Sequence, residues 1–360
     1  MVRSQMNSPE TYMIRCLELA RLGAGHTAPN PMVGAVLVHG DRVIGEGYHR
    51  QYGQAHAEVN AIASVKEEDR QYIPEATLYV SLEPCAHHGK TPPCADLVIE
   101  KKIPRVVIGC RDPFPQVNGK GIEKLLAAGV EVELGMMEKE CVELNRRFFT
   151  FNTLNRPFIV LKWAQSANGR IAGGEGVRTL ISNEYTNRLV HKWRTEEAAI
   201  LVGTRTALLD DPALTARLWK GPDPVRLVID KDLRLPPTLK LFGGGAQTIV
   251  FNMLRHEEKG PVHYYQLATD SSLVQKIAVA LYRLKIQSVL VEGGARLLQS
   301  FIDEGCWDEA RVITNNELEI PGGLSSPVLG DAVLRSRETL FSDTIRYYTN
   351  PAYTDPAAVR

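Results

Sequence analysis

The pattern of hydrophobic and polar positions predicts alternating helices and strands over the first 150 residues. Predicted helices cover residues 11–22, 56–65, 95–101, 121–128 and 138–149, and predicted strands cover residues 32–38, 42–48, 77–81, 105–110 and 130–134. The first two strands form a hairpin that turns at Gly40-Asp41. Such a succession of elements indicates a three-layer α/β/α sandwich.

The pattern restarts after Asn155-Arg156-Pro157, which we take as a domain boundary. Predicted strands then cover residues 158–162, 198–202, 225–229, 248–251 and 288–291, and predicted helices cover residues 184–194, 271–284 and 295–303. A chain of 360 residues is long enough for two domains. We therefore predict a first α/β domain over residues 8–155 and a second over residues 156–350.

His56-Ala57-Glu58, together with Glu83-Pro84-Cys85 and Cys94, supplies three metal ligands and one further carboxylate. One imidazole and two thiolates suit Zn²⁺ and leave its fourth coordination position for water. The nearby Glu58 would then carry the proton while the activated water attacks a ring carbon and ammonia departs. These motifs are typical of deaminases that act on nucleobase-like rings.

Eight residues separate Cys85 from Cys94, where two are usual. His87, His88 and Lys90 in this loop could bind an anion, and a substrate phosphate is the natural candidate. Two alternatives are a closed site with His87 or His88 as fourth ligand, and a disulfide between the two cysteines. Neither alternative explains the glutamate of the first motif.

Charge and cysteine content narrow the classes of function. Because 42 basic residues balance 42 acidic ones, no net field attracts nucleic acid, and the substrate should be small. Six cysteines suit a reducing compartment better than a disulfide scaffold. The sequence shows neither a secretion signal nor a run of about 18 apolar residues, so we expect a cytoplasmic protein without a membrane partner.

A second candidate site follows the predicted strand 288–291. That strand ends at Glu292-Gly293-Gly294 before a helix, an arrangement that can bind phosphate, although a plain turn is the alternative. The loop 210–217 contains two aspartates and Arg217 and could bind a sugar phosphate, although its acidic start could instead cap a helix. Lys162 and Arg194 either add charge to this cleft or are solvated surface residues.

Five motifs together resemble the bifunctional riboflavin-biosynthesis deaminase/reductase family. They are Asn30-Pro31-Met32-Val33-Gly34, His56-Ala57-Glu58, the segment from Glu83-Pro84-Cys85 to Pro92-Pro93-Cys94, Asp210-Asp211-Pro212 with Arg217, and Glu292-Gly293-Gly294. The match spans about residues 10–315. The resemblance implies an N-terminal cytidine-deaminase-like α/β/α domain and a C-terminal dihydrofolate-reductase-like α/β domain.

The resemblance also implies two consecutive reactions. The first is the zinc-dependent hydrolytic deamination of 2,5-diamino-6-(5-phosphoribosylamino)pyrimidin-4-one. The second is the reduction by NADPH of the ribosyl group of 5-amino-6-(5-phosphoribosylamino)uracil to ribityl. We therefore expect a small-molecule pyrimidine ribose phosphate as substrate, Zn²⁺ and NADPH as cofactors, no nucleic acid partner, and a homo-oligomer.

The resemblance assigns roles to individual residues of this chain. In the deaminase half, it makes Glu58 the proton shuttle and implies zinc binding by His56, Cys85 and Cys94, with substrate contacts from Asn30, His87, Lys90 and Asn118. In the reductase half, it implies substrate contacts from Arg194, Leu214, Arg217 and Glu292. It implies cofactor contacts from Ala164, Thr206, Asp210 and the turn at Gly293 and Gly294, where we also place Lys162.

Two further expectations concern the reduction. Asp210 is positioned to handle a proton during hydride transfer. Lys231 and Arg234 follow the strand that ends at Ile229, and one of these cations could pair with the 2′-phosphate of NADPH.

Two segments depart from the family pattern. Ser166-Ala167-Asn168-Gly169 carries an amide in place of a carboxylate, and Arg178-Thr179-Leu180-Ile181 lacks a tryptophan that would offer a stacking surface. Residues after Asn315 match poorly. Two other functions remain open: a deaminase of free bases or nucleosides with a C-terminal binding module, and a non-catalytic scaffold with structural zinc. The cations Lys90 and Arg217 argue against a phosphate-free substrate.

Overall fold

The structure is a computed structural model that describes residues 8–87, 92–174, 179–268 and 271–352. The chain divides into two compact units, of which the first ends at Asn155 and the second begins at Arg156. Each unit has its own sheet and its own buried clusters.

The first unit contains a five-stranded sheet in the order β2-β1-β3-β4-β5. Its strands are β1 (Gly34–His39), β2 (Arg42–Tyr48), β3 (Thr77–Leu82), β4 (Arg105–Cys110) and β5 (Glu131–Leu134). β1 pairs antiparallel with β2 and β3, whereas β3, β4 and β5 run parallel. The carboxyl ends of β3 and β4 therefore lie at the same edge, and the segments that follow them are neighbours.

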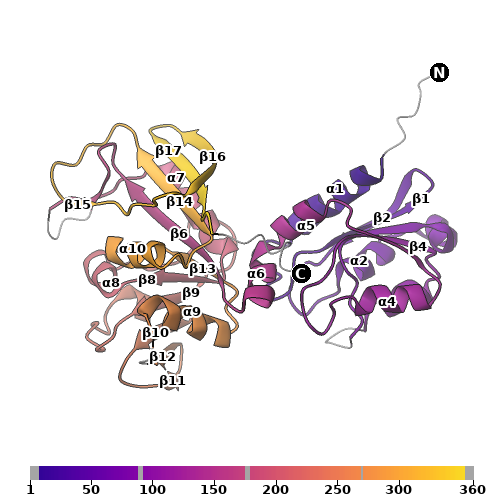
Figure 1. The fold of residues 1–360 in the computed structure, drawn as a ribbon, viewed down its shortest axis with the longest axis horizontal. Helices are drawn as coiled ribbons and strands as arrows, with labels where there is room; N and C mark the ends of the chain where they lie inside the picture. Colours follow the sequence, from indigo (N-terminus) through magenta and orange to yellow (C-terminus); the bar gives the residue numbers. More distant parts are fainter. Residues whose placement is uncertain (1–7, 88–91, 175–178, 269–270, 353–360) are drawn as a thin grey trace. The chain divides into compact units, whose positions relative to one another are not determined.

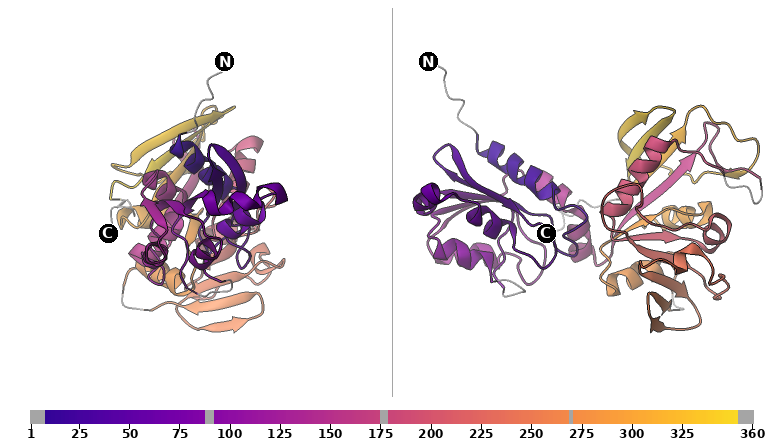
Figure 2. Two further views of the ribbon diagram at one scale, coloured as in Figure 1. Left: turned by 90° about the vertical axis from the view of Figure 1, so that its right-hand side faces the viewer. Right: turned by 180° about the vertical axis from the view of Figure 1, so that it is seen from behind.

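Helices cover both faces of this sheet. They are α1 (Pro9–Arg21), α2 (Ala57–Ala63), α3 (Cys94–Glu100), α4 (Lys120–Ala127), α5 (Glu138–Leu144) and α6 (Arg146–Leu154), with a 3₁₀ segment at Glu67–Glu75. Val36 packs with α1 and α5, and the next residue, Leu37, packs with α2, α3 and α4, because successive strand side chains point to opposite faces. Figure 1 and the right view of Figure 2 show α1 and α4 on opposite sides of the sheet.

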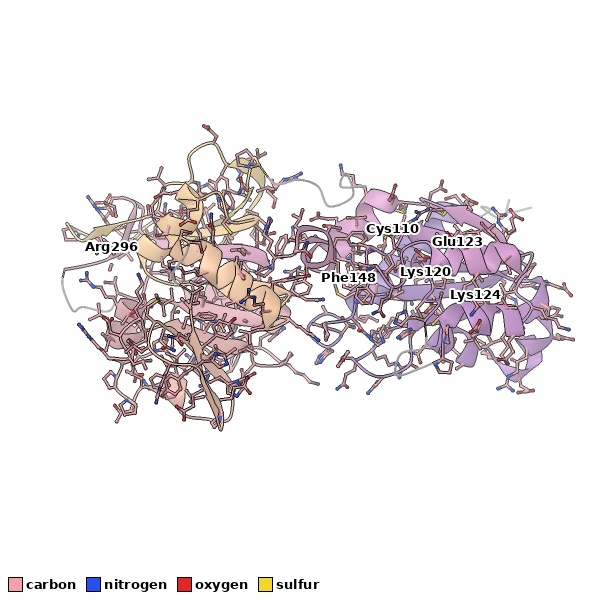
Figure 3. The ribbon with its side chains drawn as sticks, turned by 60° about the horizontal axis from the view of Figure 1, so that its bottom comes forward. Cys110, Lys120, Glu123, Lys124, Phe148 and Arg296 are labelled. Carbon is pink, nitrogen blue, oxygen red and sulfur yellow. The ribbon has the colours of Figure 1, made fainter. Side chains whose placement is uncertain are left out.

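One of these helices, α4, shows the division between core and solvent. Ile122 and Leu125 are buried against the sheet. Lys120, Glu123 and Lys124 lie along the rest of the helix (Figure 3). A surface helix of this kind is stabilised mainly by the packing of its apolar face.

The first unit differs from the sequence prediction at three points. The helix predicted over residues 138–149 is interrupted at Asn145, whose side chain accepts a hydrogen bond from Met32 N at 2.8 Å and donates one to Met32 O at 2.8 Å. His56 was predicted in the first turn of its helix, but it precedes α2 as an extended N-cap residue. The 3₁₀ segment Glu67–Glu75 was not predicted.

The second unit contains a ten-stranded sheet in the order β11-β12-β10-β9-β8-β13-β6-β14-β17-β16. Its strands are β6 (Phe158–Gln165), β8 (Ala199–Val202), β9 (Val225–Ile229), β10 (Thr248–Asn252), β11 (Glu257–Lys259), β12 (Val262–Gln266), β13 (Ser288–Val291), β14 (Glu309–Asn315), β16 (Val333–Leu340) and β17 (Asp343–Thr349). The strands from β12 to β14 in this order are parallel. β11 is antiparallel to β12, and β17 is antiparallel to both of its neighbours, β14 and β16. A short pair, β7 (Arg170–Ala172) and β15 (Leu324–Ser325), lies apart.

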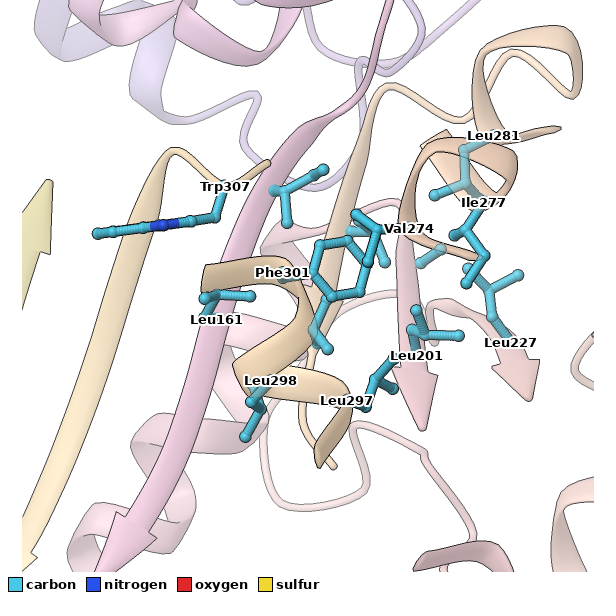
Figure 4. Packing of buried hydrophobic residues seen from close by; sticks show 14 of the residues in the cluster. Leu161, Leu201, Leu227, Val274, Ile277, Leu281, Leu297, Leu298, Phe301 and Trp307 are labelled. Carbon is cyan, nitrogen blue, oxygen red and sulfur yellow. The ribbon is translucent and has the colours of Figure 1, made fainter. Parts of the chain in front are cut away.

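Helices again cover both faces. α9 (Leu273–Arg283) and α10 (Ala295–Asp303) pack on one face, and Figure 4 shows Phe301 of α10 among the buried side chains of that cluster. α7 (Glu184–Glu196) and α8 (Thr204–Asp210) contribute to the clusters on the other face. The neighbouring strands β8 and β13 are thus followed by helices on opposite faces, which is the topological switch point where α/β proteins bind ligands.

Several elements of the second unit were not predicted. β14 carries Glu309 and Arg311, which are both buried and form an ion pair at 2.5 Å. These charged residues interrupt the apolar run that would have predicted a buried strand. β16 is exposed along nearly its whole length and therefore lacks an apolar alternation. α8 buries only Ala207, which leaves no helical apolar repeat to detect.

Within the described ranges, no helix has both the length and the apolar content that crossing a membrane requires.

Two candidate active sites

The first site is a cluster of three metal-binding side chains. His56 precedes α2, Cys85 follows β3, and Cys94 begins α3, so three elements bring the ligands together. The ligand atoms of these residues all lie within 4.8 Å of one another. His56 Nδ1 is 3.6 Å from Cys85 Sγ and 3.4 Å from Cys94 Sγ. This donor set and spacing fit Zn²⁺.

Neither alternative to an open metal site appears in the described part of the chain. Cys85 and Cys94 are both free thiols. The cluster contains three potential ligands and does not include His87. His88, the other candidate for a fourth ligand, lies outside the described residues, as does Lys90.

The position of Cys85 favours its thiolate form. Hydrogen bonds from Cys94, and then from His56, lower the pKa of the Cys85 thiol to about 4. The backbone N–H of Cys94 donates to Cys85 Sγ at 3.3 Å. A thiolate is the form that binds a metal.

Glu58 lies beside these ligands in α2 and is 3% exposed. Burial raises the pKa of Glu58 to about 7, and the charge of Cys85 acts in the same direction. Its Oε2 atom is buried and has no hydrogen-bond partner in the described structure. A buried carboxyl group with one unpaired oxygen next to metal ligands fits a proton carrier.

Asn30 reaches the same site through a histidine that the sequence analysis did not identify. Asn30 Nδ2 is 3.2 Å from Nε2 of His49, and the His49 ring lies 5.3 Å from that of His56 between centroids. His49 Nδ1 lies 3.1 Å from the carbonyl oxygen of Ala55. His49 directly follows β2 and precedes His56 with residues 50–55 between them, which was the available sequence signal.

Glu83 joins the metal ligands to the segment that contains Asn118. Its carboxylate accepts four backbone N–H groups, from Asp112 at 3.2 Å, Gly119 at 3.0 Å, Gly121 at 2.9 Å and Ile122 at 3.3 Å. At Gly121 a Cβ atom would lie 1.9 Å from Pro84 O, so only glycine allows this approach. The exposed Asn118 therefore lies in a segment whose backbone is hydrogen-bonded to Glu83, two residues before the potential metal ligand Cys85.

Two more side chains lie near this segment. His87 has its ring centroid 6.2 Å from that of Phe114, and its Nδ1 atom is buried without a partner in the described structure. Burial raises the pKa of Asp112 to about 7, and the charge of Glu83 adds to this effect. Asp112 and Phe114 were not identified from the sequence, although both follow β4 at the edge where β3 also ends.

The second site lies at the switch point of the ten-stranded sheet. Gly203 follows β8 and Gly293 follows β13, and a Cβ atom added to Gly203 would lie 3.9 Å from Gly293 O. A Cβ atom on Gly293 would lie 2.9 Å from the side chain of Thr206, in the first turn of α8. These contacts bring together Thr206, Gly293 and Gly294, three of the residues predicted to bind the cofactor. They lie beside the N-terminus of α10.

A buried ion-pair group adjoins this turn. Arg194 makes two hydrogen bonds to Glu292, at 2.8 and 2.7 Å, and Lys162 Nζ lies 3.8 Å from Glu292 Oε2. Burial alone would raise the pKa of Glu292, but Arg194 and Lys162 outweigh it and lower the pKa to about 2. Burial lowers the pKa of Lys162. Lys162 and Arg194 are thus partly buried members of the site and not solvated surface residues.

The loop after α8 places its residues differently. Arg217 is exposed, whereas the side chain of Leu214 is 2% exposed and packs in the core. Asp210 is the last residue of α8. Asp211 is the C-cap residue of α8, and its Oδ1 accepts a hydrogen bond from Lys240 N, at the start of the 3₁₀ segment Lys240–Phe242, at 2.8 Å.

The remaining predicted cofactor residues lie in or directly after two strands, β6 and β9, that β8 and β13 separate in the sheet. Ala164 is in β6, and Lys231 follows β9 and is exposed. Arg234, the alternative cation, is 80% exposed and lies 3.5 Å from Asp232. Lys231 thus has no ion pair in the described structure, whereas Arg234 has one.

The amide of Asn168 has a structural explanation. Its Nδ2 donates to Ile320 O at 2.9 Å, and its Oδ1 accepts from Ser166 Oγ at 2.6 Å and from Ile320 N at 3.2 Å. An ionised carboxylate could not make the donated bond. Asn168 therefore ties the turn after β6 to the segment before β15. Leu180 is 79% exposed, and Arg178 lies outside the described residues.

Comparison with known proteins identifies the family. The family model of the RibD C-terminal domain matches residues 157–316, and that of the cytidine and deoxycytidylate deaminase zinc-binding region matches residues 6–110. A riboflavin biosynthesis protein RibD from Aquifex aeolicus (strain VF5) is 41% identical over 338 residues, which cover 91% of this chain and 92% of that protein. The chain belongs to the RibD family.

Solved structures agree with this assignment. A diaminohydroxyphosphoribosylaminopyrimidine deaminase/5-amino-6-(5-phosphoribosylamino)uracil reductase from Thermotoga maritima has a TM-score of 0.86 and 38% identity, with coverage of 95% of this chain and 98% of that chain. Acinetobacter baumannii RibD, form 1, has a TM-score of 0.84 and 32% identity, with coverage of 94% and 98%. As a RibD family member, the protein is a bifunctional deaminase and reductase of riboflavin biosynthesis. The predicted cytidine-deaminase-like and dihydrofolate-reductase-like folds are confirmed.

Proposed function

We propose that the first unit deaminates 2,5-diamino-6-(5-phosphoribosylamino)pyrimidin-4-one and that the second reduces the ribosyl group of 5-amino-6-(5-phosphoribosylamino)uracil with NADPH. The observation that carries the first half is the cluster of His56, Cys85 and Cys94 beside the unpaired carboxyl oxygen of Glu58. The names of the similar proteins supply the substrate.

In the deaminase site, His56, Cys85 and Cys94 would hold Zn²⁺. The ion supplies the acidity that activates water for attack on the ring carbon. Glu58 takes the proton from this water and passes it to the departing amine, since its pKa near 7 allows both protonation states. Asn30, His87, Asn118 and Lys90 bind and orient the pyrimidine and its ribose phosphate.

In the reductase site, the chain positions two bound molecules against each other. NADPH supplies the hydride. The turn at Gly293 and Gly294, with the N-terminus of α10, suits the cofactor phosphates, and Thr206 packs against that turn. Arg217 binds the substrate phosphate, and Arg194 and Glu292 orient the sugar. Lys162 contacts the cofactor, and Asp210 handles a proton.

The decisive test of the deaminase proposal is Glu58→Gln in the full chain. We expect this variant to retain one zinc per chain, measured by atomic absorption, and to lose deamination by at least about a hundredfold, because the amide cannot carry the proton. Glu67→Gln, on the exposed 3₁₀ segment, is the matched control. Near-normal turnover of Glu58→Gln with zinc bound would refute the shuttle role.

The cofactor proposal is tested by comparing NADPH with NADH. We expect a higher kcat/KM with NADPH, and we expect Lys231→Ala to reduce that preference while Arg234→Ala leaves it in place. The reason is that Lys231 is exposed at the carboxyl end of β9 without an ion pair in the described structure, whereas Arg234 has Asp232 nearby. Equal efficiency with both cofactors would contradict the proposal.

We further propose that the protein works in the cytoplasm as a homo-oligomer. Free thiols at all six cysteines support a reducing compartment. The stacked rings of Tyr185 and Phe341, 4.4 Å apart and 46% and 71% exposed, are apolar surface that a second copy would cover. Sedimentation analysis of the purified chain would show a monomer if the assembly proposal is wrong.

A further inference from the structure

His191 is a buried side chain of α7 to which the established chemistry gives no role. It is 1% exposed. Its Nδ1 atom accepts a hydrogen bond from the backbone N–H of Leu218 at 3.4 Å. A ring nitrogen that accepts a hydrogen bond carries no proton, so the neutral imidazole has its proton on Nε2.

Leu218 directly follows Arg217, and α7 fixes the chain on both sides of that arginine. Arg194 of the same helix donates to Thr215 O at 3.0 Å, and Lys192 lies 5.8 Å from the centre of the Trp219 ring. The segment is thus bound to α7 at residues 215, 218 and 219.

Arg217 itself is not engaged by the protein. Its side chain is exposed and makes no hydrogen bond or ion pair with any described residue. The residue before it, Ala216, donates its N–H to Asp223 Oδ1 at 2.7 Å. A free guanidinium on a backbone held at both neighbours is a pre-organised anion-binding group.

The surroundings of His191 keep it neutral. The charges near it come from Arg194 on its own helix, Arg217 on the loop, Lys162 on β6 and Glu292 after β13. Burial lowers the pKa of His191 to about 4, and the three cations add to this effect. At neutral pH the Nδ1 lone pair is therefore available to Leu218.

We propose that His191 is a positioning residue of the reductase site, which holds Arg217 in place for the 5′-phosphate of the substrate by accepting the Leu218 N–H. This inference rests on the proposed reductase function. It adds a buried hydrogen-bond acceptor to the contacts that hold the backbone beside Arg217.

The test compares His191→Leu with His191→Asn in the full chain, assayed as a reductase with supplied 5-amino-6-(5-phosphoribosylamino)uracil and with its dephosphorylated riboside. Asn can place Oδ1 where Nδ1 lies, whereas Leu has no acceptor. We expect His191→Leu to raise KM for the phosphorylated substrate at least about tenfold, with kcat within about threefold. His191→Asn should remain close to the wild type.

The riboside separates positioning from general damage. It lacks the group that Arg217 binds, so His191→Leu should reduce it as well as the wild type does. Arg217→Ala is the reference variant and should show the same loss that is confined to the phosphorylated substrate. Equal losses on both substrates, or an Asn variant as impaired as Leu, would overturn the proposal.

A binding measurement keeps the inference testable without turnover. Calorimetry with ribose 5-phosphate on the full chain should show weaker binding by His191→Leu than by the wild type and unchanged binding by His191→Asn. Should Leu prevent folding, His191→Gln, whose acceptor lies farther from the helix, takes its place and should also bind more weakly. Failure of the wild type to reduce the substrate would refute the proposed function, whereas unchanged ribose 5-phosphate binding in the Leu or Gln variant would refute the role of His191.

Discussion

Buried ionisable side chains in the two sites are held in different protonation states by their neighbours. Burial moves the pKa of Glu58 up to about 7 and that of His191 down to about 4. Glu292 is also buried, yet Arg194 and Lys162 keep it ionised. In each case, burial together with the charges of the neighbouring residues decides whether the side chain is ionised.

The lowered pKa of His191 predicts an acid-sensitive step in folding stability. The unfolded chain binds a proton at a pKa of about 6.5, but the folded chain resists it until about 4. This contribution to stability is therefore fully present above the unfolded pKa of about 6.5, and it is lost as the pH decreases toward the folded pKa of about 4. The term amounts to roughly 3 kcal/mol at most.

The measurement is urea unfolding of the wild type and of His191→Asn at pH 7.5, 6 and 4.5. Asn does not titrate, so we expect the difference in unfolding free energy between the two proteins to shift in favour of the variant as the pH decreases. A constant difference across the three pH values would contradict the prediction.

Gly293 offers a second prediction at the scale of one residue. Its backbone would accept alanine, but the new Cβ would lie 2.9 Å from Thr206 Cγ2, so the turn or the threonine must shift. We expect Gly293→Ala to raise KM for NADPH about tenfold or more. Gly243→Ala, where the nearest atom is 3.8 Å away, serves as control and should leave KM unchanged.

Sequence alone identified the residues whose chemistry is carried by a motif. His56, Glu58, Cys85 and Cys94 lie within two short segments with a recognisable spacing. His191 could not be found in this way, since its role comes from a contact with Leu218, far along the chain. His49 lies closer to His56 in the sequence, but it belongs to none of the motifs. Such contacts are created by folding, and a single sequence carries no periodic signal for them.

At the scale of elements, the prediction was accurate where burial follows a simple period. β2, β4, β9, β13 and α10 have the predicted bounds. The elements that were missed bury charged residues, as β14 does, or bury little, as α8 and β16 do. The alternation of apolar and polar residues indicates which side of an element faces the core. It gives no signal where the buried side carries ion pairs, or where an edge element buries almost nothing.

Glu83 provides the prediction for this scale, because one side chain links β3 to the start of α4. Replacing it with Gln turns one acceptor oxygen into a donor, which leaves about two of the four backbone N–H groups unpaired in a buried place. We expect Glu83→Gln to destabilise the first unit by about 2–4 kcal/mol and to raise KM for deamination.

Thermal and urea unfolding, together with deaminase kinetics, measure these effects. Glu123→Gln is the matched control, because Glu123 lies on the exposed side of α4 (Figure 3) and should change neither quantity. A Glu83→Gln protein with wild-type stability would show that the four hydrogen bonds contribute little.

At the scale of the whole molecule, each unit has a complete sheet with helices on both faces. The three proposed zinc ligands all belong to the first unit, and the switch-point residues all belong to the second. The chemistry of one site therefore requires no residue of the other.

This separation predicts reciprocal single-site variants in the full chain. We expect Cys85→Ser to abolish deamination and to leave the reduction of supplied, already deaminated substrate largely intact. Asp210→Asn should do the reverse. Both activities are measured on the same preparations, with circular dichroism and sedimentation as controls for folding and assembly. A folded Cys85→Ser protein without reductase activity would show that the two sites are coupled.

The four N–H groups that Glu83 accepts have a consequence for how this enzyme can change. A carboxylate that recognises only main-chain groups is indifferent to the side chains of the segment it secures. Asp112, Asn118 and their neighbours can thus be exchanged while the anchorage persists, with proline, the crowded Gly121 and Gly119, whose φ is +88°, as exceptions. The backbone of this segment beside the proposed metal ligands is therefore fixed, while most of its side chains can vary. Substitutions there can change the selectivity for the pyrimidine ring without changing the fold.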